Sequence, residues 1–307
     1  MGIPNVKALE LIVLSLLAKR TLARKPEPEA VTDQSQSVKD YNRVMETNLT
    51  ANYAVGLDLI YRTGVKTHGA KALDLCSGPG YFALCLAKYL NYSSVKGVDL
   101  SLPMVDSANK NSKQWNLSNR AQFFRENILH INEFSKYDVI TFTNAAHHMP
   151  DVRVIKQILE KAQSLVKDTG LILLTDLARL KTSKLTEKFV RYAGREFIEK
   201  NMPAMYEDFH NSMYAAFSPE ELSAAIPSHS DRLWVHIIPR GLTCFQALIG
   251  LPVGETSVFK RDSAQWATSD IHSSPDSISD WKVLKNVVNN AEIVLYHPST
   301  NISKAAA

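Results

Sequence analysis

Short apolar runs alternate along residues 70–176 with stretches whose apolar side chains recur at helical spacing. We expect the first kind to form strands and the second to form helices. Because runs rich in β-branched residues alternate with amphipathic helices, the pattern predicts a parallel sheet with right-handed crossovers. The predicted strands are 70–76, 94–100, 121–125, 137–143 and 170–176, and the predicted helices are 81–90, 104–115 and 152–166.

The regions on either side of this alternation extend the predicted domain. Apolar positions recur at helical spacing over residues 39–62, which predicts one or two helices packing over the sheet. Residues 180–217 are longer than an ordinary connection and rich in aromatic residues and Met, so we expect a helical cap there. Two further apolar runs, 233–238 and 243–249, predict a pair of strands that closes the sheet.

The N-terminal apolar run, residues 8–18, is shorter than the roughly 20 residues that span a bilayer. We expect a short helix docked on the domain. A membrane-surface helix, giving peripheral membrane contact through residues 8–25, or a cleaved segment are the alternatives. The polar, proline-containing residues 25–38 predict a linker.

These patterns divide the 307 residues into three regions. Residues 1–38 are predicted to be an N-terminal helix and linker, and 39–250 the main domain, with the cap at 181–217. Residues 251–307 are Ser- and Asn-rich, with one predicted helix at 279–290, and the sequence assigns them no function.

Composition narrows the function classes. The net charge is only +4, and no basic run interleaved with aromatic residues occurs, so no nucleic-acid partner is expected. Cys76, Cys85 and Cys244 are too few for a disulfide framework and form no Cys-x-x-Cys pair. We therefore expect reduced thiols, a cytoplasmic protein and no metal site.

The segment that most strongly indicates a ligand-binding site is LDLCSGPG, residues 73–80, at the end of the first predicted strand. Gly78 and Gly80 allow a tight turn and a close approach of the backbone to a ligand. The next helix begins near Tyr81, so its N-terminal amides face the same crevice. Asp99 ends the second strand, where a carboxylate can accept hydrogen bonds from two ribose hydroxyls.

The glycine turn alone also fits a dinucleotide fingerprint, because Ala83 completes a Gly-x-Gly-x-x-Ala pattern. Asp74 argues against that alternative, since an acid there suits a ligand with an ammonium group better than a pyrophosphate. The first strand also follows about seventy residues of chain, including helices able to cover the site. The one Tyr-x-x-x-Lys pair, Tyr92 and Lys96, falls between the first two strands, which is the wrong place for reductase chemistry.

Four segments in order, LDLCSGPG, GVDLS, YDVITFTNAAHHM and LILLTDL, resemble the successive motifs of class I S-adenosylmethionine-dependent methyltransferases. The resemblance covers roughly residues 41–249 and is closest to small-molecule methyltransferases with a cap insertion. It implies an α/β, Rossmann-like, mostly parallel seven-stranded sheet with helices on both faces and the last strand antiparallel. It implies S-adenosyl-L-methionine as the cofactor and leaves the acceptor open.

The resemblance also implies roles for individual residues. Asp74 and the glycine turn would lie beside the amino-acid part of the cofactor, Asp99 would hold the ribose, and Leu100 would lie against adenine. Asn127 stands where the family has an acid, a departure, although its carbonyl can still accept from the adenine amino group. The remaining predicted cofactor residues are Cys76, Gly78, Pro79 and Gly80 in the turn, Ile128 through its amide, and Asn144 through its carbonyl.

Methyl transfer from a sulfonium depends mainly on orientation and exclusion of water, and needs a general base only if the nucleophile must lose a proton. His147 and His148, just past the fourth strand, are the first candidates. His210 and Asp208 in the cap are weaker ones. Residues with a predicted role against the substrate are Tyr53, Tyr192, Tyr206 and Tyr214.

The sequence predicts methyl transfer to an O, N or S nucleophile of a small molecule. The alternatives are a protein or peptide methyltransferase, a nicotinamide-dependent oxidoreductase on a similar scaffold, and a binding module without turnover. A closed cap favours a small acceptor, and an open groove would favour a protein.

Overall fold

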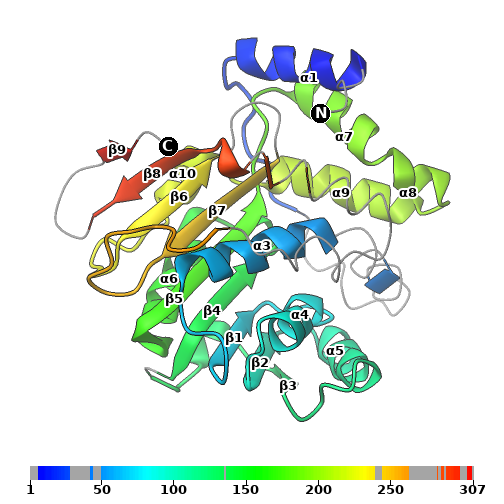
Figure 1. Ribbon diagram of the computed structural model, residues 1–307. Helices are drawn as coiled ribbons and strands as arrows, with labels where there is room; N and C mark the ends of the chain where they lie inside the picture. The colour runs from blue at the N-terminus through cyan, green and yellow to red at the C-terminus, as the bar shows by residue number, and fades with distance from the viewer. Residues whose placement is uncertain are drawn as a thin grey trace.

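The computed structural model describes residues 6–27, 42–43, 50–134, 136–238, 244–262, 282, 285–286, 288–297 and 303–305. Its centre is one mixed sheet of nine strands in the order β3-β2-β1-β4-β5-β7-β6-β8-β9 (Figure 1). The strands are β1 (Lys71–Leu75), β2 (Ser94–Asp99), β3 (Ala121–Arg125), β4 (Tyr137–Thr143), β5 (Val166–Leu177), β6 (Trp234–Ile238), β7 (Phe245–Gly250), β8 (Glu292–Tyr296) and β9 (Ser303–Ala305).

The first five strands pair in parallel, and β7 runs antiparallel to both β5 and β6. The predicted α/β class and mostly parallel sheet with an antiparallel closing strand are therefore confirmed. The strand order reverses between β1 and β4, so the crevice for a ligand lies at the carboxyl ends of these strands.

The prediction of seven strands was two strands short. The C-terminal region, to which the sequence assigned no role, adds β8 antiparallel to β6, and β9 antiparallel to β8. Tyr296 of β8 also donates a hydrogen bond from its hydroxyl to Ser223 Oγ at 2.8 Å. This part of the tail therefore extends the sheet. The predicted helix at 279–290 lies largely outside the described residues.

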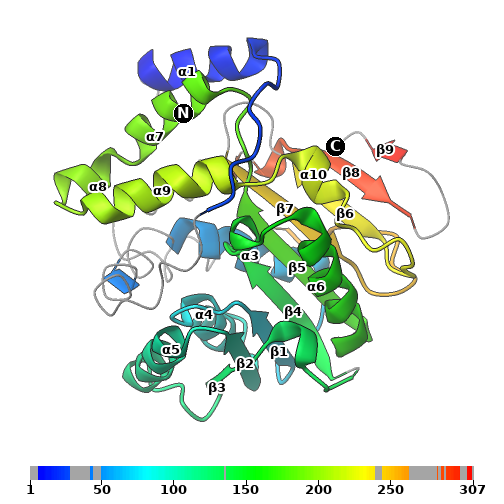
Figure 2. The same ribbon diagram turned by 180° about the vertical axis from the view of Figure 1, so that it is seen from behind.

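Helices cover both faces of the sheet (Figures 1 and 2). One face carries α3 (Thr50–Thr63), α4 (Tyr81–Tyr89) and α5 (Leu102–Gln114), and the other carries α6 (Val152–Leu165) and α10 (Pro219–Ser223). Each face has its own buried apolar cluster. The sequence specifies the helix starts locally: Asp151 caps α6, and Ser218 with Glu221 forms a capping box on α10.

A further layer of helices stands above the carboxyl ends of the parallel strands (Figure 2). It comprises α1 (Val6–Leu17), α7 (Ser183–Ala193), α8 (Arg195–Glu199) and α9 (Pro203–Ala215). Leu11 of α1 is buried in one cluster with Leu185 and Met213, so the expected docking of the N-terminal helix is present. None of the described helices is long and apolar enough to cross a membrane.

The chain after α1 was predicted to become a linker from residue 25, but residues 18–27 are bound to the body of the protein. Arg24 donates hydrogen bonds to the backbone oxygens of His147, Met149, Pro150 and Ala215, at 2.6–2.9 Å. We call residues 18–27 the N-terminal strap. The rest of the predicted linker, 28–38, lies outside the described residues.

Candidate active site at the carboxyl ends of the strands

The turn after β1 is built from left-handed backbone. Cys76, Gly78 and Gly80 have φ values of 51°, 50° and 83°. A Cβ on Gly80 would lie 2.5 Å from the ring of Phe123, so only glycine fits there. The turn leads directly into α4, which begins at Tyr81 as predicted. Packing against Phe123 and the left-handed backbone thus account for Gly80, and the close approach of the backbone to a ligand stays a prediction.

Asp99 is fixed at the end of β2 by the backbone. Its Oδ2 accepts from Gly78 N and its Oδ1 from Ser101 N, both at 2.9 Å. Burial raises the pKa of this carboxyl above its ordinary value. Each carboxylate oxygen keeps a further lone pair, so the group can still accept from ribose hydroxyls. Asp99 therefore fits the predicted role.

Asp74 lies in the middle of the sheet, only 1% exposed, beside Thr141 on the neighbouring strand. Thr141 donates a hydrogen bond from Oγ1 to Asp74 Oδ1 at 2.6 Å, and the backbone amide of Ala83 donates a second. Burial raises the pKa of Asp74 to about 7. Among the described residues Asp74 has no ion-pair partner, so it fits a ligand that carries a positive charge.

Ser77 is a site residue to which the sequence assigned no role. Its Oγ is buried in the glycine turn and has no hydrogen-bond partner among the described residues. A Cβ on Gly97 would lie 2.9 Å from this oxygen, so the close packing of β2 brings the two together. Buried hydroxyls are normally paired, and an unpaired one at a turn is suited to a ligand. A hydroxyl directly before the first glycine of a ligand-binding turn was the signal available.

Some of the groups predicted to contact the cofactor already form hydrogen bonds within the protein. Leu100 is 63% exposed, as an apolar wall for a flat ring would be. Asn127 uses its Oδ1 to cap a short helix by accepting from Leu129 N at 2.9 Å, and Ile128 is buried. Asn144, after β4, has left-handed backbone with φ 51° and donates its own amide to Thr175 O. Their roles toward a cofactor stay predictions.

His147 is held rigidly beside the crevice. It follows β4 in the short helix η2 (Ala146–His148), and its side chain is 7% exposed. Its Nδ1 lies 2.6 Å from Asp176 Oδ1, and its backbone amide donates to Asp176 Oδ2 at 2.6 Å. Burial alone would lower the pKa of His147, but the Asp176 carboxylate raises it above its ordinary value. Asp176, which the sequence analysis missed as a partner, fixes the ring.

His148 meets a carboxylate from the N-terminal strap. Its Nδ1 lies 2.5 Å from Glu27 Oε2, and Ser212 Oγ donates to Glu27 Oε1 at 2.6 Å. The pKa of Glu27 is about 2, because the two histidines and Ser212 outweigh the effect of burial. Asp208 lies near this group: burial first, and then the charge of Glu27, raise its pKa. The structure thus brings His147, His148 and Asp208 together.

The other predicted catalytic and substrate residues lie elsewhere. His210 Nε2 contacts Glu187 Oε1 at 2.9 Å, and Tyr214 donates to the same oxygen at 2.8 Å. Tyr53 is buried in the core with its ring 5.8 Å from that of Phe82. Residues that pack in the apolar cluster shared by α1 and the cap include Tyr192 and Tyr206. Packing thus accounts for these tyrosines, and a role against the substrate stays a prediction.

Comparison with known proteins agrees with this geometry. Residues 72–170 match a family described as a methyltransferase domain. The fold is similar to that of a Methanococcus maripaludis protein to which S-adenosyl-L-methionine-dependent methyltransferase activity is ascribed (TM-score 0.53, 20% identity, 76% of this chain and 99% of that one). It is also similar to the plantazolicin methyltransferase BpumL in complex with SAH (TM-score 0.50, 16% identity, 71% of this chain and 93% of that one).

No curated protein is significantly similar to the chain in sequence. The matched segment runs from β1 to the start of the apolar part of β5 and contains the glycine turn, Asp99 and η2. Sheet order, site geometry and the match of residues 72–170 to a methyltransferase domain therefore agree, and the chain has the class I, Rossmann-like fold of S-adenosyl-L-methionine-dependent methyltransferases.

Proposed function

We propose that the protein transfers the methyl group of S-adenosyl-L-methionine to an O, N or S nucleophile of a small molecule. When bound, the cofactor supplies a methyl group already activated by its sulfonium. Asp99 would accept hydrogen bonds from the ribose, and Asp74 would balance the positive charges of the cofactor. Ser77 would donate or accept a hydrogen bond at the glycine turn.

The observation that carries the choice of a small acceptor is the cover over η2. The N-terminal strap is bound to the backbone of residues 147–150 and of Ala215, the last residue of α9, through Arg24. The guanidinium also stacks on the ring of Phe217 at 3.9 Å. His147 is consequently buried. A covered site suits a small molecule that is enclosed, whereas a protein substrate needs an open groove.

Catalysis under such a cover can come mainly from orientation and exclusion of water. A neutral amine needs no base at all, whereas a hydroxyl must lose its proton. The catalytic roles predicted for His147, His148 and Asp208 remain predictions. Their position past β4, beside the crevice, is what supports them.

The test is transfer of labelled methyl groups from S-adenosyl-L-methionine to two separate pools, one of small amines, phenols and thiols, and one of peptides and proteins. We expect label in the small-molecule pool, and clearly less of it with Asp99→Ala at a low concentration of S-adenosyl-L-methionine. Label confined to the protein pool would establish the alternative function. Cofactor binding without label in either pool would indicate a binding module.

We also propose a cytoplasmic location. Its support is that Cys76, Cys85 and Cys244 are all free thiols, which suits a reducing compartment. Fractionation of cells that express the full chain should recover it with cytoplasmic markers. Recovery with secreted or organelle markers would refute the proposal.

A further inference from the structure

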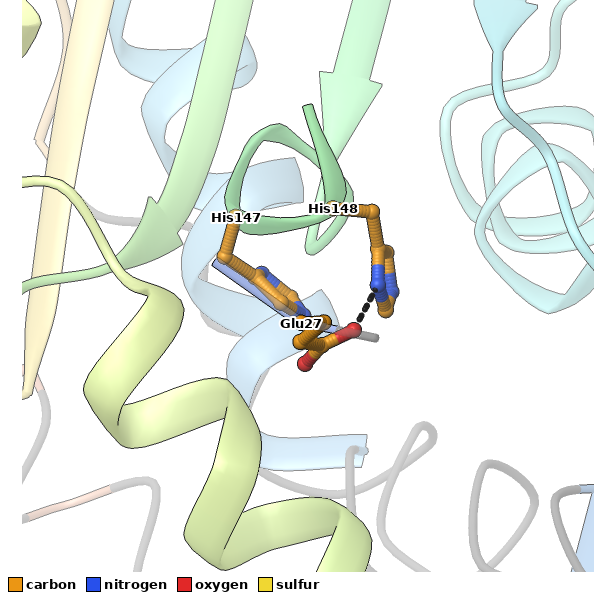
Figure 3. Close-up of side chains that lie close together, drawn as sticks. All are labelled: Glu27, His147 and His148. Atoms are coloured by element: carbon orange, nitrogen blue, oxygen red, sulfur yellow. Dashed lines mark hydrogen bonds and ion pairs between the residues drawn. The ribbon is translucent and has the colours of Figure 1, made fainter. Parts of the chain in front are cut away.

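Two histidine rings and a carboxylate converge beside the crevice (Figure 3). His147 and His148 come from η2, and Glu27 comes from the N-terminal strap, about 120 residues earlier in the chain. One ligand atom from each of the three lies within 4.8 Å of the others. Two ligands of one zinc ion, each about 2.0–2.1 Å from it, are separated by somewhat less than this, so small rotations of the side chains would close the site.

The surroundings of His147 are those of a metal-binding histidine. Metal-ligating imidazoles usually donate their second ring nitrogen to a carboxylate, which fixes the tautomer and the ring orientation. Asp176 holds Nδ1 of His147 at 2.6 Å and its backbone amide at 2.6 Å. The remaining nitrogen, Nε2, is thereby left as the ligand atom, and Asp176 fixes the orientation of the ring.

The third ligand is also held in place. Ser212 donates to one oxygen of Glu27, while the other oxygen lies against His148. Arg24, three residues earlier, anchors the strap to four backbone oxygens. The side chains of His147 and Glu27 are 7% and 13% exposed, and that of His148 is 38% exposed. The group is therefore open to solvent at His148 and enclosed at His147 and Glu27.

We propose that Glu27, His147 and His148 form a binding site for a divalent transition-metal ion of the zinc type. Two imidazoles and one carboxylate are a known ligand set for such ions, and three protein ligands leave at least one coordination position open. The expectation of no metal site rested on cysteine spacing, which does not detect this group. The site does not depend on methyl transfer.

The experiment is titration of the full, tag-free chain with Zn²⁺ by calorimetry at pH 7.5, together with Co²⁺ absorption spectra. The variants are Glu27→Gln, His147→Asn and His148→Gln. Glu27→Gln is the most informative, because an amide can keep hydrogen bonds to Ser212 and His148 while losing the charge. The matched controls are Glu187→Gln and His210→Gln, which alter a similar His–Glu pair in the cap.

We expect about one Zn²⁺ per chain in the wild type and in both controls, with a tetrahedral Co²⁺ spectrum. Each of the three variants should bind Zn²⁺ at least about tenfold more weakly. Asp176→Asn should weaken binding about 10- to 100-fold without removing a ligand. Absence of stoichiometric binding, or equal affinity in Glu27→Gln and wild type, would overturn the proposal.

A parallel titration with S-adenosylhomocysteine separates this proposal from the proposed function. A chain that binds Zn²⁺ but not that ligand keeps the metal site and loses the methyltransferase function. A chain that binds S-adenosylhomocysteine but not Zn²⁺ keeps the methyltransferase function and loses the metal site. Circular dichroism of each variant excludes unfolding as the cause of lost binding.

Discussion

Replacing Asp74 by Asn should make the stability of the cofactor-free protein less sensitive to a rise in pH from acidic to neutral. The folded-state pKa of Asp74 is about 7 against an ordinary 3.8, so the folded protein keeps a proton that the unfolded chain releases between these values. The free energy of unfolding therefore falls as pH rises through this window. About 3 pKa units correspond to about 4 kcal/mol, of which about 3 kcal/mol falls between pH 5 and 8.5.

Urea unfolding at pH 5 and 8.5 measures this effect. Asn at position 74 has no proton to lose, so the variant should gain about 3 kcal/mol relative to wild type on going from pH 5 to 8.5. Asp151→Asn is the control. The pKa of Asp151 is lowered to about 2 by Arg153, so its contribution is constant above pH 5 and is lost only in stronger acid. If the difference in free energy of unfolding between wild type and Asp74→Asn does not change with pH, the reasoning is refuted.

Three further substitutions, and Gly254→Ala as a control for the first of them, test other parts of the structure. Gly80→Ala should lower the free energy of unfolding by about 2–5 kcal/mol in chemical denaturation, because its Cβ would overlap Phe123 at a φ of 83°. Gly254→Ala, with open space around it, should lose only about 1 kcal/mol. Burial lowers the pKa of His236 to about 4, so the folded protein resists a proton that the unfolded chain takes up in acid. On going from pH 7.5 to 4.5, the free energy of unfolding of wild type, measured in urea, should therefore fall by about 2–3 kcal/mol more than that of His236→Gln. A difference between the two proteins that does not change with pH would contradict this. Arg24→Ala should lower the free energy of unfolding in urea by about 2–4 kcal/mol and speed proteolysis of the N-terminal strap, because four hydrogen bonds to backbone oxygens are lost. An unaltered rate of cleavage would mean that Arg24 does not hold the strap in place.

The sheet up to β7 was predictable because its strands are buried apolar runs separated by helices with one apolar face. The strands β3 and β4 begin and end at the predicted residues. The glycine turn was equally clear, since left-handed backbone at Gly78 and Gly80 is what those glycines permit. β8 was missed although its sequence, EIVLY, is apolar, because it is short and lies within a polar tail.

The N-terminal strap and the group around His147 could not be predicted. Arg24 binds backbone oxygens that lie 123–191 residues away. Because every residue has a backbone oxygen, the sequence does not indicate which of them bind Arg24. Glu27 is one of three acids in the polar residues 25–38, and only the fold brings it to His148. The cap tyrosines have the residue types of a pocket, but their positions are set by packing.

Calorimetric titration with S-adenosylhomocysteine, beside NADH and NADPH, tests the central claim most directly. We expect binding on the order of micromolar for the first ligand. Asp99→Ala should weaken it by about 1–3 kcal/mol, since the ribose loses its carboxylate partner. Binding of a nicotinamide cofactor, with none of S-adenosylhomocysteine, would contradict the account.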